Sequence, residues 1–410
     1  MSSSPRGRRP RRSRAPALLL LVAGLLLLPP PALRPATAGP IEGEPPYPPS
    51  ERITDLSLDW TTLRRLAPGS DNWHTTWAGD GQVYSSWGDG SGLGGSGSQA
   101  RVSLGLARLT GNTAALLGGV NLIGGVRPRV ATCWKRFTGE LADPNQGGPC
   151  YRVGRHGKSR SLLGLGNYLY AWVTPGSGTT GYQEARIYRA PLNSPNRWEQ
   201  GFAFSRNAPD AMLSPAMVQA GRAYADIPDY VYAFANRYAP EFPDDNGSDI
   251  MLGGEVYLLR AAKGANLLSR SSWQFFAGLD ANGAPGWTTD SASKRPAITV
   301  PSGVGRIGSA IYVRALDRFL FLTEHTQKSA GYFALLEAPK PWGPWRTVAH
   351  TRLTAPGDTQ YGGFFYSILP TSVRDGGAGF TLIYTGGGAA SDAGDALLAV
   401  DGRFTLGAAP

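Results

Sequence analysis

The sequence predicts an all-β domain built as a five-bladed β-propeller. The 410 residues include 55 glycines and 33 prolines, and only 17% are charged. Short runs of aromatic and β-branched residues, bounded by Gly, Asn, Asp and Pro, fill the chain, and long apolar patterns of helical period are nearly absent. This pattern is typical of a protein made of many short strands. A strand motif that recurs five times then favours a propeller among the all-β folds.

The recurring motif is an aromatic-rich strand that follows a polar or glycine-containing turn. Its copies are residues 82–87, 167–172, 229–234, 318–322 and 380–384. A second strand alternates with it and leads through a turn to Trp198, Trp273 or Trp345, and a weaker copy starts near Val102. Two alternating strand pairs per unit give five four-stranded sheets. A β-sandwich, the alternative fold, predicts no such matched units.

The repeat also accounts for the size of the domain, which we expect to run from about Arg52 to the C-terminus. This length exceeds the size at which a single hydrophobic core usually stops growing. A repeat architecture avoids that limit because each unit packs only on its neighbours. A further strand near residues 397–405 is placed to close the ring with a strand from the start of the domain.

The N-terminal residues have the features of an export signal. Residues 1–14 hold six arginines and no acidic residue, residues 15–28 are mostly apolar, and Ala36-Thr37-Ala38 suits signal cleavage. This order predicts a secretory signal peptide over residues 1–38. A transmembrane anchor is disfavoured because the apolar run is shorter than the roughly 20 residues that span a bilayer. The proline-rich leader that follows, residues 39–51, is expected to be extended and poorly ordered.

Charge and cysteine content fit an exported protein. Removing residues 1–38 takes away seven arginines and no acid, so the net charge falls from +10 to +3. A nucleic-acid partner is therefore not expected, because it needs a basic face on the folded domain. We expect a secreted, periplasmic or cell-envelope location, with no integral membrane span after cleavage. In such a compartment Cys133 and Cys150 predict a disulfide, and two buried free thiols are the alternative.

The residues that most suggest chemistry lie between Gly69 and Gly90, where three aspartates, three tryptophans and a histidine occur. Asp80-Gly81 is typical of a hairpin turn. Asp71 and Asp89 then fall at the same end of two adjacent strands, opposite that turn. Two carboxylates on one rim suit glycoside hydrolysis, in which one acts as acid and the other as base or nucleophile. Turn or capping roles are the simpler alternative for both aspartates.

This stretch resembles the opening signature of a bacterial family first described as domain of unknown function 4185. The shared pattern is G-S-D-N-W-x-x-T-W-A-x-D-G-x-x-Y-x-x-W-G-D-G. The family includes endo-D-arabinanases of glycoside hydrolase family 183, which cut mycobacterial cell-wall arabinan in the central funnel of a five-bladed propeller. The resemblance implies that Asp71 and Asp89 are the catalytic carboxylates and that Asn72, Trp73 and Trp77 shape the pocket.

The rest of the chain resembles this family more loosely. Residues 338–345 and 361–365 are similar to its later proline-tryptophan and aromatic strands. The chain departs from the pattern at His74 and Gly79, where a proline and an acid are expected, and at residues 386–392. These departures leave the fold unchanged and put the substrate in doubt.

Three further residues are candidate substrate contacts. Trp87 stands beside Asp89, and an aromatic ring there is suited to pack on a sugar face. Glu324 and His325 directly follow the fourth copy of the recurring strand, much as Asp89 follows the first. A role in the central funnel is therefore a hypothesis for both.

Several other chemistries are disfavoured. The chain has no G-x-S-x-G nucleophile motif and no H-E-x-x-H metal motif, and its four histidines are scattered. Residues 244–249 resemble a calcium loop in composition only, because the glycine is misplaced. We expect no cofactor and leave open a structural cation at the propeller axis.

These observations predict an exported glycoside hydrolase that acts on a polysaccharide, with endo-cleavage of D-arabinan as the finer expectation from the resemblance. Two other functions stay open. One is a carbohydrate-binding propeller without catalysis, and the other is a propeller that binds proteins at the cell surface.

Overall fold

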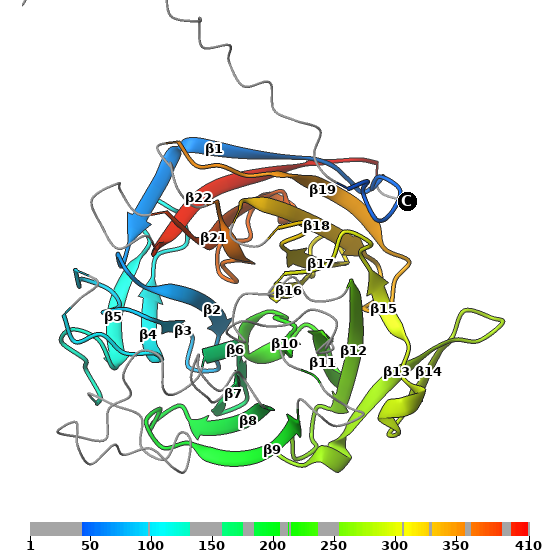
Figure 1. Cartoon of the computed structure of the whole chain (residues 1–410), viewed down its shortest axis with the longest axis horizontal. Helices are drawn as coiled ribbons and strands as arrows, with labels where there is room; N and C mark the ends of the chain where they lie inside the picture. Colours follow the sequence, from blue (N-terminus) through cyan, green and yellow to red (C-terminus); the bar gives the residue numbers. More distant parts are fainter. Residues whose placement is uncertain are drawn as a thin grey trace, which may run out of the picture. The chain divides into compact units, whose positions relative to one another are not determined.

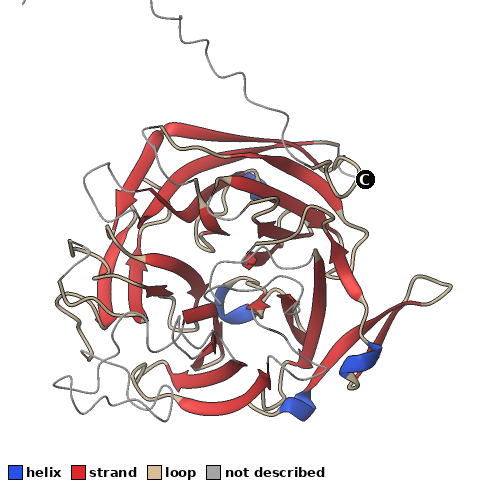
Figure 2. Ribbon diagram, viewed as in Figure 1, coloured by secondary structure: helices blue, strands red, loops and turns tan. Residues whose placement is uncertain are grey.

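Five antiparallel sheets surround one axis and form a five-bladed β-propeller, which confirms the predicted fold class (Figure 1). The computed structural model describes residues 43–96, 99–131, 158–174, 184–205, 212, 215–236, 254–305, 307–327, 330–356, 362–387 and 395–408. Strands dominate these residues, and the helices among them are short 3-10 turns (Figure 2). In this part of the chain no helix has the length and apolar character to cross a membrane.

The first two blades each contain four strands in sequence order. The first blade holds β2 (Asp71–Trp77), β3 (Val83–Gly88), β4 (Gly105–Thr110) and β5 (Gly118–Ile123). The second blade holds β6 (Lys158–Leu165), β7 (Tyr168–Thr174), β8 (Glu184–Pro191) and β9 (Glu199–Ser205).

The third blade is larger than the repeat predicts, because two short strands are added to its sheet. Its members are β10 (Ala216–Met217), β11 (Tyr230–Asn236), β12 (Glu255–Ala262), β13 (Trp273–Leu279), β14 (Pro285–Thr288) and β15 (Pro296–Thr299). The hairpin of β13 and β14 projects from the rim in Figure 1. The 3-10 turns η2 (Arg222–Tyr224), η3 (Arg270–Ser272) and η4 (Ser291–Ser293) accompany this blade.

The fourth and fifth blades complete the ring. The fourth holds β16 (Ile307–Val313), β17 (Arg318–Thr323), β18 (Tyr332–Ala338) and β19 (Arg346–Arg352). The fifth holds β20 (Phe364–Ile368), β21 (Gly379–Gly387), β22 (Asp395–Leu406) and, on its outer edge, β1 (Ile53–Leu66), with the turn η5 (Asp375–Gly377).

The strand repeat found in the sequence corresponds to fixed positions in the blades. Its five copies are the second strands, β3, β7, β11, β17 and β21. The alternating element supplies the third strands, and its tryptophans, Trp198, Trp273 and Trp345, are buried where the fourth strands begin. The second strands are buried along nearly their whole length because each is covered by neighbouring blades on both faces.

The ring is closed by pairing between the two ends of the domain, as the sequence predicts. β1 runs antiparallel to β22, from Ile53 opposite Leu406 to Leu66 opposite Leu397. Ile53 and Leu398 are fully buried in the core that this pairing covers. The closure leaves β22 with partners on both sides, and β1 takes its place as the outer edge of the last blade.

Residues 47–50, in the second half of the leader, are held against the propeller by hydrogen bonds, so the prediction of poor order was wrong for them. Ser50 N donates to Thr347 O over 2.8 Å, and Thr347 N donates to Pro48 O over 2.9 Å. The Tyr47 hydroxyl accepts from Thr299 N over 2.8 Å. These contacts tie residues 47–50 to both the third and the fourth blade. The signal peptide, Cys133, Cys150 and residues 244–249 lie outside the described residues.

Closure by β1 predicts a sharp dependence of stability on the first strand. A chain that starts at residue 43 should unfold in one cooperative transition, because β22 keeps its partner. A chain that starts at residue 67 should lose that transition, because β22 becomes an unpaired edge and buried side chains of β1 are gone. Thermal unfolding followed by near-ultraviolet circular dichroism compares the two chains. Equal, cooperative melting of both would contradict this role of β1.

Candidate active site

Asp71 and Asp89 converge on the ammonium group of Lys158. Asp71 opens β2 and lies opposite Gly88, the last residue of β3, so Asp89 stands at the same end of the hairpin, as predicted. Lys158 opens β6 of the next blade. Its Nζ lies 3.6 Å from Asp71 Oδ1 and also forms a close ion pair with Asp89 Oδ2. The side chains of Asp71, Asp89 and Lys158 are 12%, 25% and 12% exposed, so the cluster is largely buried, with Asp89 its most exposed member.

The lysine makes this arrangement of carboxylates electrostatically tolerable. Two like charges about 4 Å apart repel by roughly 4 kcal/mol at an effective dielectric of 20. One ammonium between them offsets that repulsion and leaves the cluster with a net negative charge.

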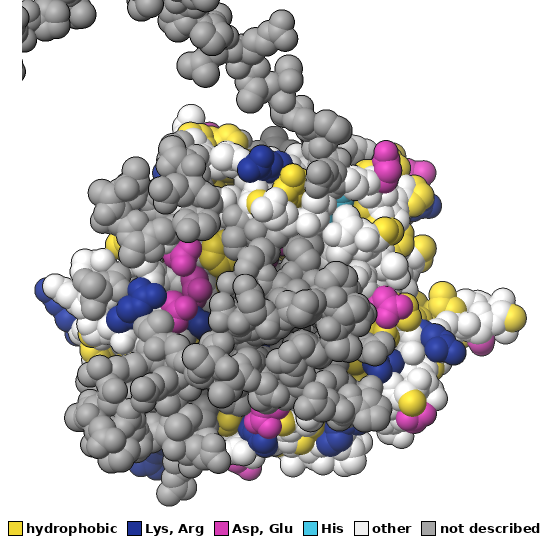
Figure 3. All heavy atoms as spheres, in the orientation of Figure 1, with side chains coloured by type: hydrophobic (Ala, Val, Ile, Leu, Met, Phe, Trp, Pro, Cys, Tyr) yellow, Lys and Arg dark blue, Asp and Glu magenta, His cyan; other side chains and the backbone are white. Residues whose placement is uncertain are grey.

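On the face drawn in Figure 3, acidic and basic side chains alternate around the rim of the described surface rather than gathering in one basic patch.

The backbone around the two aspartates departs from regular strand geometry. Asn72 (φ 65°) and Asp89 (φ 52°) adopt left-handed conformations, which Asn and Asp tolerate better than other side chains. The register of β2 against β3 shifts between Asp71 and His74. A side chain at Gly88 would meet Asp71 Oδ1 at 2.8 Å and Lys158 Nζ at 3.1 Å, so glycine makes room for the ion pairs.

Similar register shifts occur near the start of the innermost strand in four of the five blades. They are found between Asp71 and His74, Ser159 and Ser161, Ile307 and Ser309, and Phe364 and Ser367. A bulge bends a strand and re-aims its side chains, and bulges are frequent next to active sites. The inner strands are thus locally irregular on the face that carries the aspartates.

Asn72 is a buried link between blades and not a surface contact. Asn72 follows Asp71 in sequence and is 1% exposed. Asn72 Nδ2 donates to Ser159 O over 2.7 Å, and Asn72 N donates to Thr385 Oγ1 over 3.1 Å. The carbonyl oxygen of Ser159 can only accept, so the side-chain nitrogen of Asn72 faces Ser159 and the amide oxygen faces His74. His74 Nε2 lies 2.8 Å from that oxygen and donates to it. The predicted contact of Asn72 with a ligand is therefore replaced by contacts with three blades.

His74 is held in its neutral form. Burial, and secondarily the positive charge of Arg160, lower the pKa of His74 to about 3, while the carbonyls of Gly308 and Ser159 act in the opposite direction. The imidazole therefore carries no charge near neutral pH. In this form the ring carries a single N–H, and we assign it to Nε2 because the Asn72 amide oxygen, which can only accept, lies 2.8 Å away.

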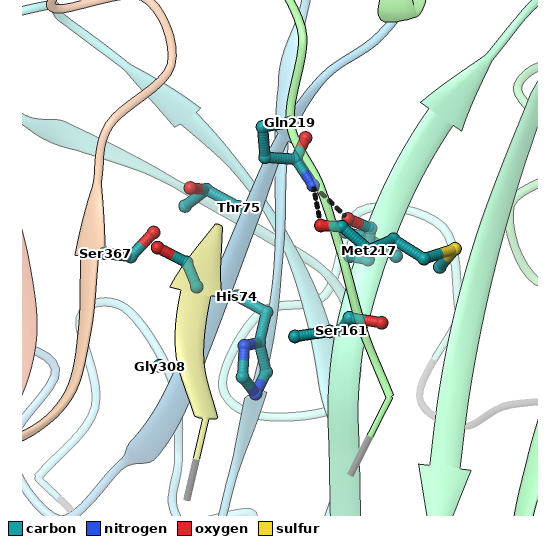
Figure 4. A pocket seen from close by; sticks show the side chains of 10 residues that line it. His74, Thr75, Ser161, Met217, Gln219, Gly308 and Ser367 are labelled. Carbon is teal, nitrogen blue, oxygen red and sulfur yellow. Dashed lines mark hydrogen bonds between the residues drawn. The ribbon is translucent and has the colours of Figure 1, made fainter. Parts of the chain in front are cut away.

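Side chains of the inner strands pack around the propeller axis, as the residues drawn in Figure 4 show. A cavity of about 10 Å³ remains, which is the size of one water molecule. All five inner strands line it, with His74, Thr75, Ser161, Gln219, Gly308 and Ser367 among the residues labelled in Figure 4. This lining contains no carboxylate, and no group of three His, Cys, Asp or Glu among the described residues is placed to hold a metal ion. A saccharide can therefore not pass through the axis at this depth.

The expected sugar platforms lie elsewhere. Trp73 and Trp87 are fully buried and stack on each other, with ring centroids 6.0 Å apart and planes at 25°. Trp77 lies at the opposite end of the hairpin, where its Nε1 donates to Gly81 O over 3.3 Å. The sequence pattern misplaces these rings because strands near a propeller axis are covered on both faces by neighbouring blades.

Glu324 and His325 are also more buried than a ligand contact requires, at 1% and 0% exposure. His325 stacks on His350, with ring centroids 3.6 Å apart and planes at 20°. Burial, and then the neighbouring His350, lower the pKa of His325 to about 4. In this structure His325 therefore packs as a neutral core residue and not as a funnel residue.

Sequence reasoning missed Lys158, although a signal for it was present. The recurring motif covers second strands, and Lys158 lies before one of them, in a first strand. Asp71 lies twelve residues before the second-strand residue Val83, and Lys158 lies eleven before the corresponding Leu169. The two spacings differ by one residue, and both residues open the first strand of their blade.

Comparison with known proteins supports the fold. A putative hydrolase from Bacteroides ovatus is similar over 82% of this chain and 87% of its own, with 14% identity and a TM-score of 0.52. An α-L-arabinofuranosidase from Podospora anserina, solved with cellotriose, is similar over 83% and 92%, with 12% identity and a TM-score of 0.43. No protein-family model and no curated protein matches the chain. At these identities, the first likeness establishes the propeller fold and nothing finer.

The shared lysine predicts a loss of stability when it is removed. Lys158→Met should lower the free energy of unfolding by about 2 kcal/mol, because two partly buried carboxylates lose their common counter-charge. Urea unfolding measures this change. In a background that carries Asp71→Asn and Asp89→Asn, the same substitution should cost much less. Equal costs in both backgrounds would show that Lys158 does not interact with the aspartates.

The buried His74 predicts that the protein becomes less stable in acid. Its pKa is about 3 in the folded chain and 6.5 as a reference for the unfolded one. The unfolded state therefore binds the proton first, and the stability that His74 contributes above pH 6.5 is lost as the pH falls from there toward 3. The slope from this residue should approach about 1.4 kcal/mol per pH unit. Urea unfolding of the wild type and of His74→Gln at several pH values tests this, and parallel pH profiles would contradict it.

Proposed function

We propose that this protein is a glycoside hydrolase that acts on a polysaccharide, with Asp71 and Asp89 as its catalytic carboxylates. The observation that carries the proposal is the meeting of both aspartates at one ammonium group, on the rim between two blades. Paired carboxylates are the machinery of most glycosidases. The similar structure from Bacteroides ovatus carries the name of a putative hydrolase, which is consistent with this activity.

In this proposal one aspartate protonates the leaving oxygen of the glycosidic bond, and the other activates water or attacks the sugar carbon. Lys158 helps to determine which aspartate takes which role. Because a single ammonium serves both carboxylates, the aspartate that acts as proton donor must give up its share of the lysine when the sugar binds. The second aspartate then keeps the full ion pair and stays in the charged form that a base or nucleophile needs.

The finer proposal is endo-cleavage of D-arabinan. Its support is the likeness of residues 69–90 to the signature of the arabinanase family, together with the placement of that stretch as the β2–β3 hairpin. A propeller that only binds carbohydrate would depend on exposed aromatic platforms. Trp73 and Trp87 are buried and do not supply them, so the carboxylate cluster favours hydrolysis over binding alone.

The proposal predicts that each aspartate is needed for turnover. Asp71→Asn and Asp89→Asn should each lower kcat on D-arabinan by at least about 100-fold, the usual scale for loss of an acid–base group. Release of reducing ends from D-arabinan and from a panel of other polysaccharides measures the activity.

Asp80→Asn provides the matched control, since it makes the same change at the turn of the same hairpin. Asp80 Oδ1 there accepts from Gln82 N and Asp80 Oδ2 accepts from the Tyr84 hydroxyl. An asparagine keeps the first bond through its oxygen, and its amide nitrogen can instead donate to the Tyr84 hydroxyl. This variant should keep wild-type activity. Full activity in both folded site variants would remove Asp71 and Asp89 from the mechanism, and sugar binding with no turnover in the wild type would favour the binding propeller.

A further inference from the structure

We propose that Asn72 is a positioning residue that fixes Asp71 and Lys158 relative to each other. We call its hydrogen bonds to Ser159, Thr385 and His74 the Asn72 clamp. The catalytic purpose of the clamp rests on the hydrolase proposed above, but its effect on the ion pairs can be measured without any substrate.

The clamp acts on the two residues that follow the members of an ion pair. Asn72 follows Asp71 in β2, and Ser159 follows Lys158 in β6. The bond from Asn72 Nδ2 to Ser159 O, 2.7 Å long, joins these two strands directly. A second bond, from Ser86 Oγ to Ser159 Oγ over 2.7 Å, ties Ser159 to the other strand of the hairpin. The backbones that carry Asp71 and Lys158 are therefore bridged one residue away from the ion pair.

A third blade limits the remaining freedom of Asn72. Its backbone N donates to Thr385 Oγ1 in β21, and Thr385 is fully buried. His74 then fixes the side-chain amide, because the neutral imidazole donates to Asn72 Oδ1 and leaves the amide nitrogen for Ser159. The edge of His74 rests on Phe365 of the fifth blade, with ring centroids 5.9 Å apart. Every polar group of the Asn72 side chain is thus assigned to one partner.

The backbone conformation gives a reason for asparagine at this position. At φ 65° a side chain is strained unless the residue is Gly, Asn or Asp. Glycine would accept the conformation but would have no amide to bridge the blades. Aspartate would accept it too, but its carboxylate has no donor for Ser159 O. Asparagine alone meets both demands.

This reasoning makes Asn72→Gly the informative variant, because it removes the clamp and keeps the left-handed backbone without strain. The readout is the rate at which an amine-reactive succinimidyl ester labels Lys158, followed by peptide mass spectrometry. The chain has six lysines, so individual sites are easily resolved. Lys263 is the internal control, since its Nζ donates to Tyr224 O and Ile227 O in the third blade, away from the clamp.

We expect Asn72→Gly to raise the labelling rate of Lys158 by about tenfold and to leave that of Lys263 unchanged. If the hydrolase proposal is also correct, kcat should fall about tenfold or more with a smaller change in KM, because misplaced groups chiefly affect the reaction step. Should Asn72→Gly fail to fold, Thr385→Val removes the acceptor of the Asn72 backbone and should raise Lys158 labelling by a smaller factor.

The outcomes separate the two proposals. Unchanged labelling of Lys158 in a folded variant would overturn the clamp, whatever the activity. Increased labelling of Lys158 together with full activity of Asp71→Asn and Asp89→Asn would keep the clamp as a structural device and end the hydrolase proposal. An equal rise at Lys158 and Lys263 would show general loosening of the fold and would also overturn the clamp.

Discussion

The pairing of β1 with β22 is the constraint on which the rest of the molecule depends. It joins the first strand of the domain to the last and thereby creates the seam between the fifth and the first blade. That seam carries Thr385, which accepts from Asn72, and Asp395, whose carbonyl accepts from Gly69 just before β2. The strand that bears Asp71 is therefore positioned by a contact between residues more than 300 apart in sequence. Local propensity alone would not hold the site, because its framework exists only once the ring is closed.

The left-handed backbone positions and the partly buried charges belong to the same few residues of the site. Asn72 and Asp89 have left-handed backbones, and the ion pairs of Asp71, Asp89 and Lys158 are partly removed from water. Each feature costs free energy by itself, and such features persist only where the surrounding structure determines them strongly. Buried hydrogen bonds to two neighbouring blades provide that surrounding structure here. Backbone outliers of this kind cluster at active sites, which agrees with the role proposed for the two aspartates.

Much of the fold could be read from the sequence, and the site only in part. Short strands with a repeated pattern identified the second strands, the Asp80-Gly81 turn and the closing strand, because these follow from local spacing. The burial of Trp73 and Trp87 could not be read in the same way. A strand near the axis has neighbouring blades on both faces, so alternation of residue types no longer separates inside from outside. Lys158 is harder to find for a related reason, since it meets Asp71 across a seam between blades and only its spacing from the second strand points to it.

His74 illustrates how far a motif can be carried from one protein to another. The arabinanase-like signature leads us to expect proline at this position, and a proline side chain has no group that could donate to Asn72. In this chain His74 fills that role and extends the network beneath the site into the first blade's contact with the fifth. The aspartates at both ends of this stretch lie at one end of the β2–β3 hairpin, and His74 supports them through Asn72. The carboxylates therefore depend on the hairpin as a frame, and in this chain buried hydrogen bonds to neighbouring blades brace that frame.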